Sequence, residues 1–181
     1  RFGHGFEYIS EELKSNKKYI TFFALFTFSV YSIEIQEIRN NFLNVTSIKE
    51  ADNYIQLLEK SNLKEANTYK AALLLMKAKF AFFPFNKWSY FKNGSELLDI
   101  SIESDPTNIE MRYIRFLFQS EIPNFLGYHK NLQEDYNLII NNIIKSSLPL
   151  KFKQTMLSKM LLVKGITESQ TVKIHKITQR I

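Results

Sequence analysis

The sequence contains no cysteine, and it has only 5 glycines and 4 prolines in 181 residues. Without cysteine there are no disulfides, thiol nucleophiles or cysteine-ligated zinc sites. Few glycines and prolines leave few turns, so the elements of secondary structure should be long. Long elements in a chain rich in Leu, Ile, Lys and Glu are usually helices, and 45% apolar residues are enough to form a core. The composition therefore favours an all-α protein over an all-β sandwich.

A strong excess of charge of one sign is also missing from the body of the chain. The net charge of +6 comes from 24 basic and 18 acidic residues. Residues 33–164 contain 17 of the basic and 14 of the acidic residues, a surplus of only 3. Such a mixture indicates a solvated surface and not a nucleic-acid footprint, so we expect no nucleic-acid partner.

The apolar run from Tyr19 to Val30 is shorter than the roughly 20 residues that a membrane-spanning helix needs. Lysines precede it, and Ser32 follows in the position of a small residue at a cleavage site. This is the layout of a secretory signal, so we expect residues 17–32 to be a cleaved signal peptide and residues 1–16 to be an upstream extension that is not native. A buried core helix and an uncleaved membrane anchor are the alternatives. For a bacterial chain, the signal predicts export to the periplasm or the cell exterior.

Apolar residues recur at helical spacing after Ser32, and turn signals separate the segments. Ser47 with Glu50 predicts a capping box at the start of one helix. Pro84 should end the strongest helix in the chain. We expect residues 165–181 to be a flexible basic tail. The predicted helices cover residues 35–45, 48–58, 65–83, 87–104, 109–121, 131–147 and 150–163.

Small residues and a junction between helices give the body of the chain a family resemblance. Ala71, Ala72 and Ala78 lie in the first helix of a pair, and residues 105–110 read Asp-Pro-Thr-Asn-Ile-Glu where one helix closes and the next opens. Over residues 64–122 this resembles tetratricopeptide repeats, which are helix pairs of about 34 residues with small residues at their contact. The Trp-x-x-Leu-Gly-x-x-Tyr signature is missing. The spacing between corresponding helices is 40 residues.

The resemblance implies antiparallel helix pairs over residues 33–164. They would stack as a short right-handed superhelix of the tetratricopeptide type, with an irregular helical bundle as the alternative. The signal, the junction and residues 123–128 together also resemble small exported bacterial proteins of unassigned function.

The sequence contains no recognisable motif for metal binding, phosphate binding or nucleophilic catalysis. The three histidines, His4, His129 and His175, are too far apart in sequence for the i, i+4 pair of a helical zinc site. Neither a glycine-rich phosphate loop nor a Gly-x-Ser-x-Gly elbow occurs in the sequence. We therefore expect a protein that is not an enzyme and that has no catalytic residue, cofactor or metal.

One stripe of long polar side chains is a candidate for binding a partner. It follows one face of the helix that ends before Pro123, at spacings of four, three and four residues. Its guanidinium forks could grip a carboxylate of a partner peptide. In the alternative, the arginines pair with Asp99, Glu103 or Asp135 of this chain and fix the angle between helices. The stripe consists of Asn108, Arg112, Arg115 and Gln119.

Aromatic residues cluster around Pro84 too densely for all of them to face a core on two helices. We expect most to be buried and one or two, including Trp88, to line a groove. Residues 124–128 could form its rim, with Gly127 at a positive φ and Tyr128 beside it. The alternative for this loop is a plain turn. The cluster comprises Phe80, Phe82, Phe83, Phe85, Trp88, Tyr90 and Phe91.

These observations predict a non-catalytic helical-repeat module that binds a protein or a peptide after export. The chain would contact a membrane only through its export signal, and edge packing against a second copy is compatible with so short a repeat. One alternative is a helical binder of an apolar small molecule or lipid. A second is an enzyme whose site the sequence does not reveal.

Overall fold

The computed structural model describes residues 36–61 and 64–181. The regular secondary structure of this part of the chain is entirely helical, with no strand. The prediction of an all-α protein is confirmed. Residues 41–181 form one compact unit. The expected signal peptide (17–32) and upstream extension (1–16) lie outside the described residues. Within the described residues, no helix combines the length and the apolar character needed to cross a bilayer.

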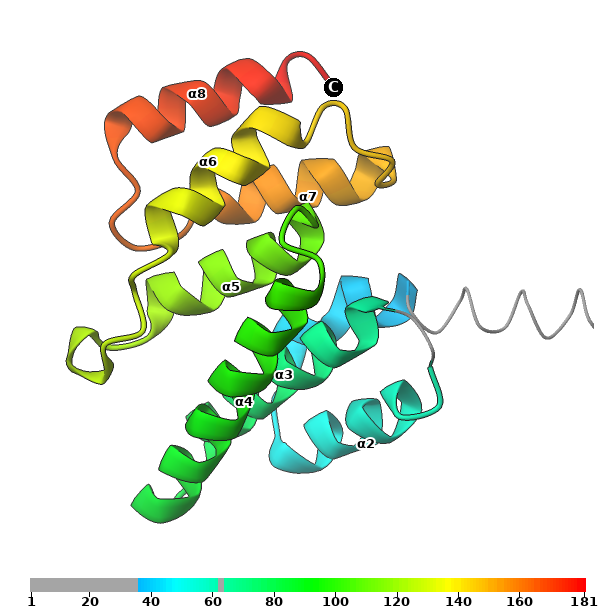
Figure 1. Ribbon diagram of the computed structural model, residues 1–181, viewed down its shortest axis with the longest axis vertical. Helices are drawn as coiled ribbons and strands as arrows, with labels where there is room; N and C mark the ends of the chain where they lie inside the picture. Colours follow the sequence, from blue (N-terminus) through cyan, green and yellow to red (C-terminus); the bar gives the residue numbers. More distant parts are fainter. Residues whose placement is uncertain (1–35, 62–63) are drawn as a thin grey trace, which may run out of the picture. The chain divides into compact units, whose positions relative to one another are not determined.

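Seven α-helices and two short 3-10 helices make up residues 41–181 (Figure 1). The 3-10 helices are η1 (Phe42–Asn44) and η2 (Asn124–Leu126). The α-helices are α2 (Ile48–Leu58), α3 (Lys64–Phe80), α4 (Pro84–Ser104), α5 (Ile109–Glu121), α6 (Leu132–Asn142), α7 (Leu150–Met160) and α8 (Glu168–Thr178).

Side chains at the helix starts explain several of these boundaries. The Ser47 hydroxyl accepts a hydrogen bond from the Glu50 amide at 3.2 Å, as the sequence predicts. The Glu50 carboxylate accepts from the Thr46 amide at 2.9 Å, so the second half of the box closes one residue earlier than expected. Pro84 does not end α3 directly: α3 stops at Phe80, and Pro84 is the first residue of α4.

Helices α3 and α4 pack most closely, and small side chains allow it. A Cβ at Gly94 would lie 2.9 Å from Leu75 Cγ and 3.0 Å from the carbonyl oxygen of Ala71. Since real Cβ atoms essentially never come so close, only glycine fits in α4 at this point. Ala71 and Ala72 are fully buried on the opposite side of the contact. The expected small residues thus lie in the tightest helix pair of the unit.

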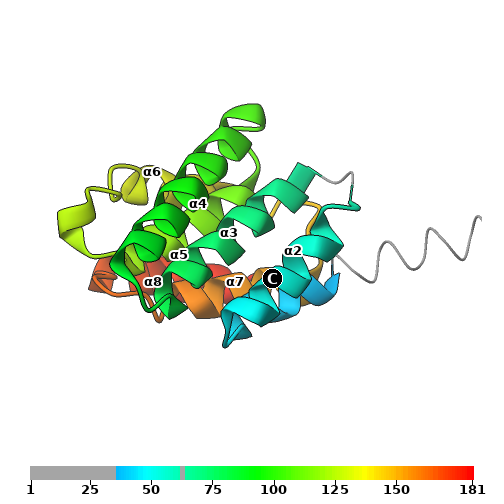
Figure 2. The same ribbon diagram turned by 90° about the horizontal axis from the view of Figure 1, so that it is seen from below.

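The core continues from this pair into the second half of the unit. Helix α5 contacts both α3 and α4 and packs along α6, while α8 contacts α6 and α7 (Figures 1 and 2). Tyr69 of α3 reaches α5 through its hydroxyl, which donates to Glu110 Oε1 at 2.7 Å. Side chains with almost no exposed surface include Leu73, Leu98, Met111, Ile114, Ile139 and Met156.

The prediction for residues 165–181 is wrong, because they form helix α8 and not a flexible tail. Thr167 caps α8 in a full capping box with Gln170. Ile174 is fully buried, and Ile177 is nearly so. The Tyr136 hydroxyl of α6 donates to the Gln170 carbonyl at 3.1 Å. The tail is polar on average, but Ile174 and Ile177 are three residues apart and share one face, which is enough to dock it.

Candidate functional site

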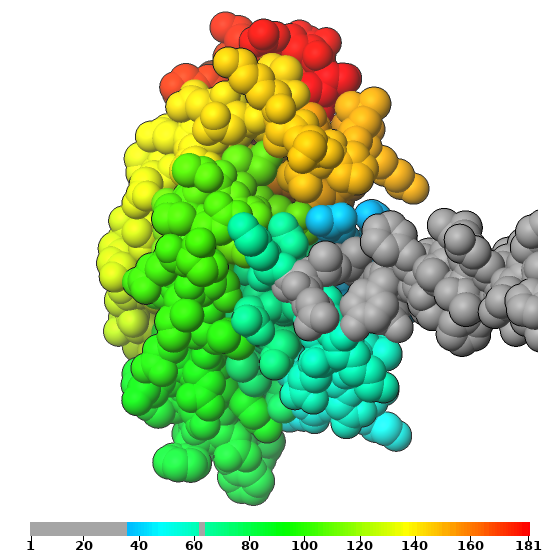
Figure 3. Space-filling view, turned by 45° about the vertical axis from the view of Figure 1, so that its right-hand side comes forward, coloured from blue at the N-terminus to red at the C-terminus, as the bar shows by residue number. Residues whose placement is uncertain are grey.

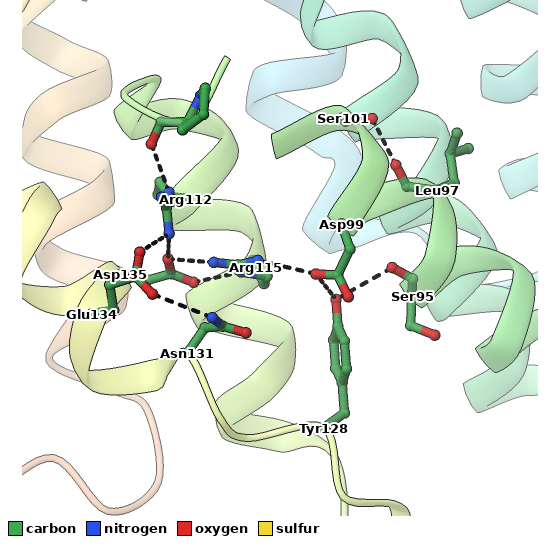
Figure 4. Close-up of polar contacts among 11 residues, drawn as sticks. Ser95, Leu97, Asp99, Ser101, Arg112, Arg115, Tyr128, Asn131, Glu134 and Asp135 are labelled. Carbon is green, nitrogen blue, oxygen red and sulfur yellow. Dashed lines mark hydrogen bonds and ion pairs between the residues drawn. The ribbon is translucent and has the colours of Figure 1, made fainter. Parts of the chain in front are cut away.

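A buried ion network joins α4, α5 and α6 (Figure 4). At its centre is Asp135 of α6, which is 0% exposed. Its Oδ1 accepts from Arg112 Nη1 at 2.8 Å and from Arg115 Nη2 at 2.8 Å, and its Oδ2 accepts from Arg115 Nε at 2.7 Å. Arg115 Nη1 also reaches Asp99 of α4 at 3.0 Å. One carboxylate therefore holds two guanidinium groups between three helices.

The outer contacts of the network add carbonyl and carboxylate acceptors. Arg112 donates to Glu134 Oε1 at 2.7 Å and to the Pro106 carbonyl at 2.9 Å. Burial opposes the charge of Arg115, but the hydrogen bonds and charges of Asp135 and Asp99 outweigh it and raise the pKa of Arg115. The hydrogen bond from Arg112, followed by one from Asn131, lowers the pKa of Glu134.

Tyr128 belongs to the same network. Its hydroxyl donates to Asp99 Oδ1 at 3.1 Å, and its ring meets Phe91 edge-on at 6.1 Å between centroids. Burial, followed by the charge of Asp99, raises the pKa of Tyr128, so this phenol stays protonated at neutral pH. The side chain is almost wholly buried. Gly127 has a φ of 69°, the left-handed conformation expected for this loop.

The stripe of candidate partner-binding residues therefore lies inside the fold. Arg112 and Arg115 are buried and paired with Asp99, Glu134 and Asp135, which is the arrangement of the intramolecular alternative, with Glu134 in place of Glu103. A role of these arginines in gripping a partner remains a prediction. Their ion pairs favour a structural role, and a binding surface would then lie elsewhere on the unit.

The two ends of the stripe are half-buried Asn108 and fully buried Gln119. Asn108 is the N-cap of α5 and accepts from the amides of Glu110 at 3.1 Å and Met111 at 3.2 Å. Its amide donates to Glu65 of α3 at 3.1 Å. Gln119 is fully buried, and among the described residues neither its Nε2 nor its Oε1 has a hydrogen-bond partner.

The clearest concave feature is an apolar groove of about 930 Å³ within residues 41–181. Helices α3, α4 and α5 supply its walls, and the segment around η2 and the end of α7 supply its edges. Trp88 and Phe91 lie in its lining with ring centroids 5.6 Å apart. Other apolar residues of the lining are Leu75, Met76, Leu117, Phe118, Leu126 and Val163.

The charged residues of the groove are mostly basic. Lys79, Lys87 and Lys159 belong to its lining, and Glu121 is the acidic residue there. Glu121 lies 3.5 Å from Lys164, which offsets its charge. The lining of the groove is therefore mainly apolar with three lysines, and it suits an apolar ligand or a peptide with acidic groups.

Aromatic residues around Pro84 are more exposed than the sequence predicts. Phe82, Phe83 and Phe85 all point into solvent, whereas most of the cluster was expected to be buried. Phe82 and Phe83 lie in the three-residue connection between α3 and α4, where only Ala81 is buried, and Phe85 lies on the exposed first turn of α4. Trp88, expected in a groove, does line one.

Sequence reasoning missed the contribution of α7 to the groove. Lys159, Leu162 and Val163 lie about 70 residues after Trp88 and reach the groove only through the packing of the unit. No local motif marks them. Phe125 and Leu126, in contrast, lie in the loop that the sequence predicts as a rim.

The two histidines of the described residues, His129 and His175, are not in the lining of the groove. His129 lies 2.7 Å from the Ile122 carbonyl through Nε2, and His175 belongs to α8. Within residues 36–61 and 64–181, no group of three or more His, Asp or Glu side chains is arranged to hold a metal ion.

The helix pair α3 and α4 and the junction before α5 are the parts that carry the resemblance to tetratricopeptide repeats. That resemblance stays a prediction. Comparison of the chain with protein-family models, with curated proteins and with solved structures finds no match.

Proposed function

We propose that the protein is a non-catalytic binding module that holds a segment of a partner protein in its apolar groove. The observation that carries this proposal is the groove itself, with about 930 Å³ of space among aromatic and aliphatic side chains of three helices. Phe125 at its edge is 86% exposed, so apolar surface continues outside the hollow. A peptide partner would cover both surfaces at once.

An amphipathic helix is the segment that such a groove suits best. Grooves between helices accept the apolar face of a helix through anchors at i, i+3, i+4 and i+7. Lys79, Lys87 and Lys159 would lie near acidic residues beside those anchors. Trp88 and Phe91 would supply the rigid aromatic contacts that often dominate binding energy.

Panning of a phage-displayed library of amphipathic helical peptides on the full chain tests this proposal. The affinity of the selected peptides would then be measured on Phe125→Ala, which removes an edge contact, and on Ala78→Trp, which fills the hollow. We expect each change to weaken binding about tenfold or more. Ile100→Ala is the matched control, because Ile100 is an exposed apolar residue of α4 outside the groove. Equal affinity for all four chains would overturn the proposal.

A second candidate function is the binding of an apolar small molecule or lipid. The volume of the groove lies within the range of about 300–1,000 Å³ that is typical of small-molecule sites. Organic extraction of the purified protein followed by mass spectrometry distinguishes this function. A stoichiometric apolar compound that is lost in Ala78→Trp would favour it over a peptide.

The proposal places the module in the periplasm or outside a bacterial cell. Support comes from the apolar run Tyr19–Val30 with its preceding lysines. Residues 1–34 would be fused to a reporter enzyme that becomes active only where disulfides form. We expect activity that disappears when residues 19–30 are deleted. A reporter that is inactive with the intact segment would overturn the assignment of location.

A further inference from the structure

The connection between α3 and α4 presents a row of aromatic side chains to solvent. We call residues 82–88 the aromatic turn. Every residue of this segment is exposed, and the exposed fractions are 88% for Phe82, 63% for Phe83, 80% for Phe85 and 53% for Trp88. Burying such side chains against one another is the usual outcome of folding, so this much exposed aromatic surface in seven consecutive residues implies that something else covers it.

The phenylalanines of the aromatic turn lie outside the groove, although Pro84, Lys87 and Trp88 of the same segment belong to its lining. Residues 84–88 are the start of α4, and this end of the helix extends away from α5 to α8 in Figure 1 and lies at the lower edge of residues 41–181 in Figure 3. Phe82, Phe83 and Phe85 are not in the lining of the groove that the structure describes. A protruding apolar tip enters a soft apolar phase easily, whereas a protein partner would need a matching pocket.

The sequence on either side of the aromatic turn carries charge of one sign. Residues 66–95 contain five lysines and neither aspartate nor glutamate. The Lys77 ammonium forms an ion pair with Asp52 Oδ1 at 2.6 Å and lies over the Tyr90 ring. Lys79 and Lys87 are exposed on either side of the phenylalanines. A flexible lysine stem beside apolar residues can place its ammonium group at the level of lipid headgroups.

We propose that the aromatic turn inserts into the interfacial region of an anionic lipid membrane. Phenylalanines that enter the acyl boundary, a tryptophan at the interface and lysines at the phosphates form the set of residues that interfacial binding uses. Anionic lipid complements Lys79 and Lys87. This inference differs from the expectation that only the export signal contacts a membrane. It goes beyond the proposed function: the aromatic turn shares Lys87 and Trp88 with the groove, but Phe82, Phe83 and Phe85, which would enter the lipid, lie outside it.

Rigidity of the turn supports insertion. Pro84 fixes φ at the first position of α4, and Phe83 is the N-cap residue. The rings of Phe82 and Phe83 meet edge-on with centroids 5.3 Å apart. Since the backbone and rings are already ordered, insertion costs less conformational entropy than it would for a free loop.

The only tryptophan of the chain lies in the aromatic turn, and this makes a direct test possible. Trp88 fluorescence of the full chain would be recorded with vesicles of phosphatidylcholine containing about one third phosphatidylglycerol, and with phosphatidylcholine alone. We expect a blue shift with the anionic vesicles, quenching by lipids brominated in the acyl chain, and a much weaker effect with the neutral vesicles. The apolar run near the N-terminus contains no tryptophan, so its own binding would not produce these signals.

Two double variants separate the contributions. Phe82→Ser with Phe85→Ser should reduce vesicle partitioning, as read by Trp88 quenching, on the order of a hundredfold. Lys79→Gln with Lys87→Gln should reduce it on the order of tenfold and remove the preference for anionic lipid. Ile100→Ser is the control, because it removes an exposed apolar side chain of α4 outside both the aromatic turn and the groove and should leave the signal unchanged.

Unchanged Trp88 emission on anionic vesicles would overturn the proposal, even if the chain sedimented with them through another segment. Equal quenching in the wild type and in the Phe82 and Phe85 double variant would do the same. Binding of selected helical peptides is measured without lipid, so failure of the groove and failure of the aromatic turn give separate results. Circular dichroism of each variant confirms that its helices are intact.

Discussion

Removal of the Asp135 carboxylate should destabilise the protein more than any change on its surface. Asp135 is fully buried and accepts three hydrogen bonds from two guanidinium groups. In Asp135→Ala, Arg115 keeps only its 3.0 Å contact with Asp99, and Arg112 keeps Glu134 and the Pro106 carbonyl. Breaking a buried ion pair on one side costs about 3–5 kcal/mol, because the remaining charge is uncompensated. This is a large part of the roughly 5–15 kcal/mol that keeps a domain folded.

Urea denaturation followed by circular dichroism measures this loss. With a slope of about 2 kcal/mol per molar urea, the midpoint should fall by about 2 M. Glu134→Gln is the matched control, since it removes the neighbouring carboxylate, whose side chain is 58% exposed, and should cost less than about 1 kcal/mol. Arg112→Ala combined with Arg115→Ala should also lower stability clearly, because it leaves Asp135 buried without its partners.

A compensating variant tests the reason and not only the size of the effect. Asp135→Ala combined with Arg115→Met removes charge on both sides and should recover part of the lost stability. The reasoning is refuted if Asp135→Ala is no more destabilising than Glu134→Gln. It is also refuted if the double variant is less stable than Asp135→Ala by as much as Arg115→Met alone lowers the stability of the wild type.

Three further outcomes follow from the structure. Gly94→Leu should cost about 1–3 kcal/mol or more, because its side chain would force α3 and α4 apart, whereas Asn93→Leu on the exposed neighbour should be nearly neutral in urea denaturation. Ile174→Ala should cost about 2–5 kcal/mol if α8 is an integral part of the fold, and a change under about 0.5 kcal/mol would show that it is not. Because the folded state lowers the pKa of Glu134, its contribution to stability is present above its ordinary pKa of 4.5 and is lost as the pH falls through the lowered value. Glu134→Gln should therefore show a shallower loss of stability in acid, as measured by urea denaturation across a pH series.

Periodicity and capping predict most of the helices, because both act within a few residues. The Ser47 cap and the helices beginning near residues 64, 109 and 150 all depend on local spacing. Helix α8 was missed because its composition is polar, although Thr167 and Gln170 form a capping box that is visible in the sequence. This capping box is a local signal for a helix start, and the average polarity of the segment does not cancel it.

Features that depend on packing between distant segments could not be predicted from spacing. The groove joins residues from Leu43 to Val163, and nothing near either one indicates the other. The same holds for Gly94, whose need to be glycine comes from the backbone of α3. For Arg112 and Arg115 the sequence offered two partners, an external carboxylate or an internal one, and only the position of α6 shows that internal carboxylates are within reach.

The shared carboxylate at the centre of the network also limits how this chain can diverge. Replacement of Asp135 alone passes through an intermediate that carries buried, unmatched cations, so a lineage is expected to lose the acid and at least one of its bases together. Relatives of this protein, once aligned, should therefore show linked substitutions at positions 112, 115 and 135, while position 134 drifts freely.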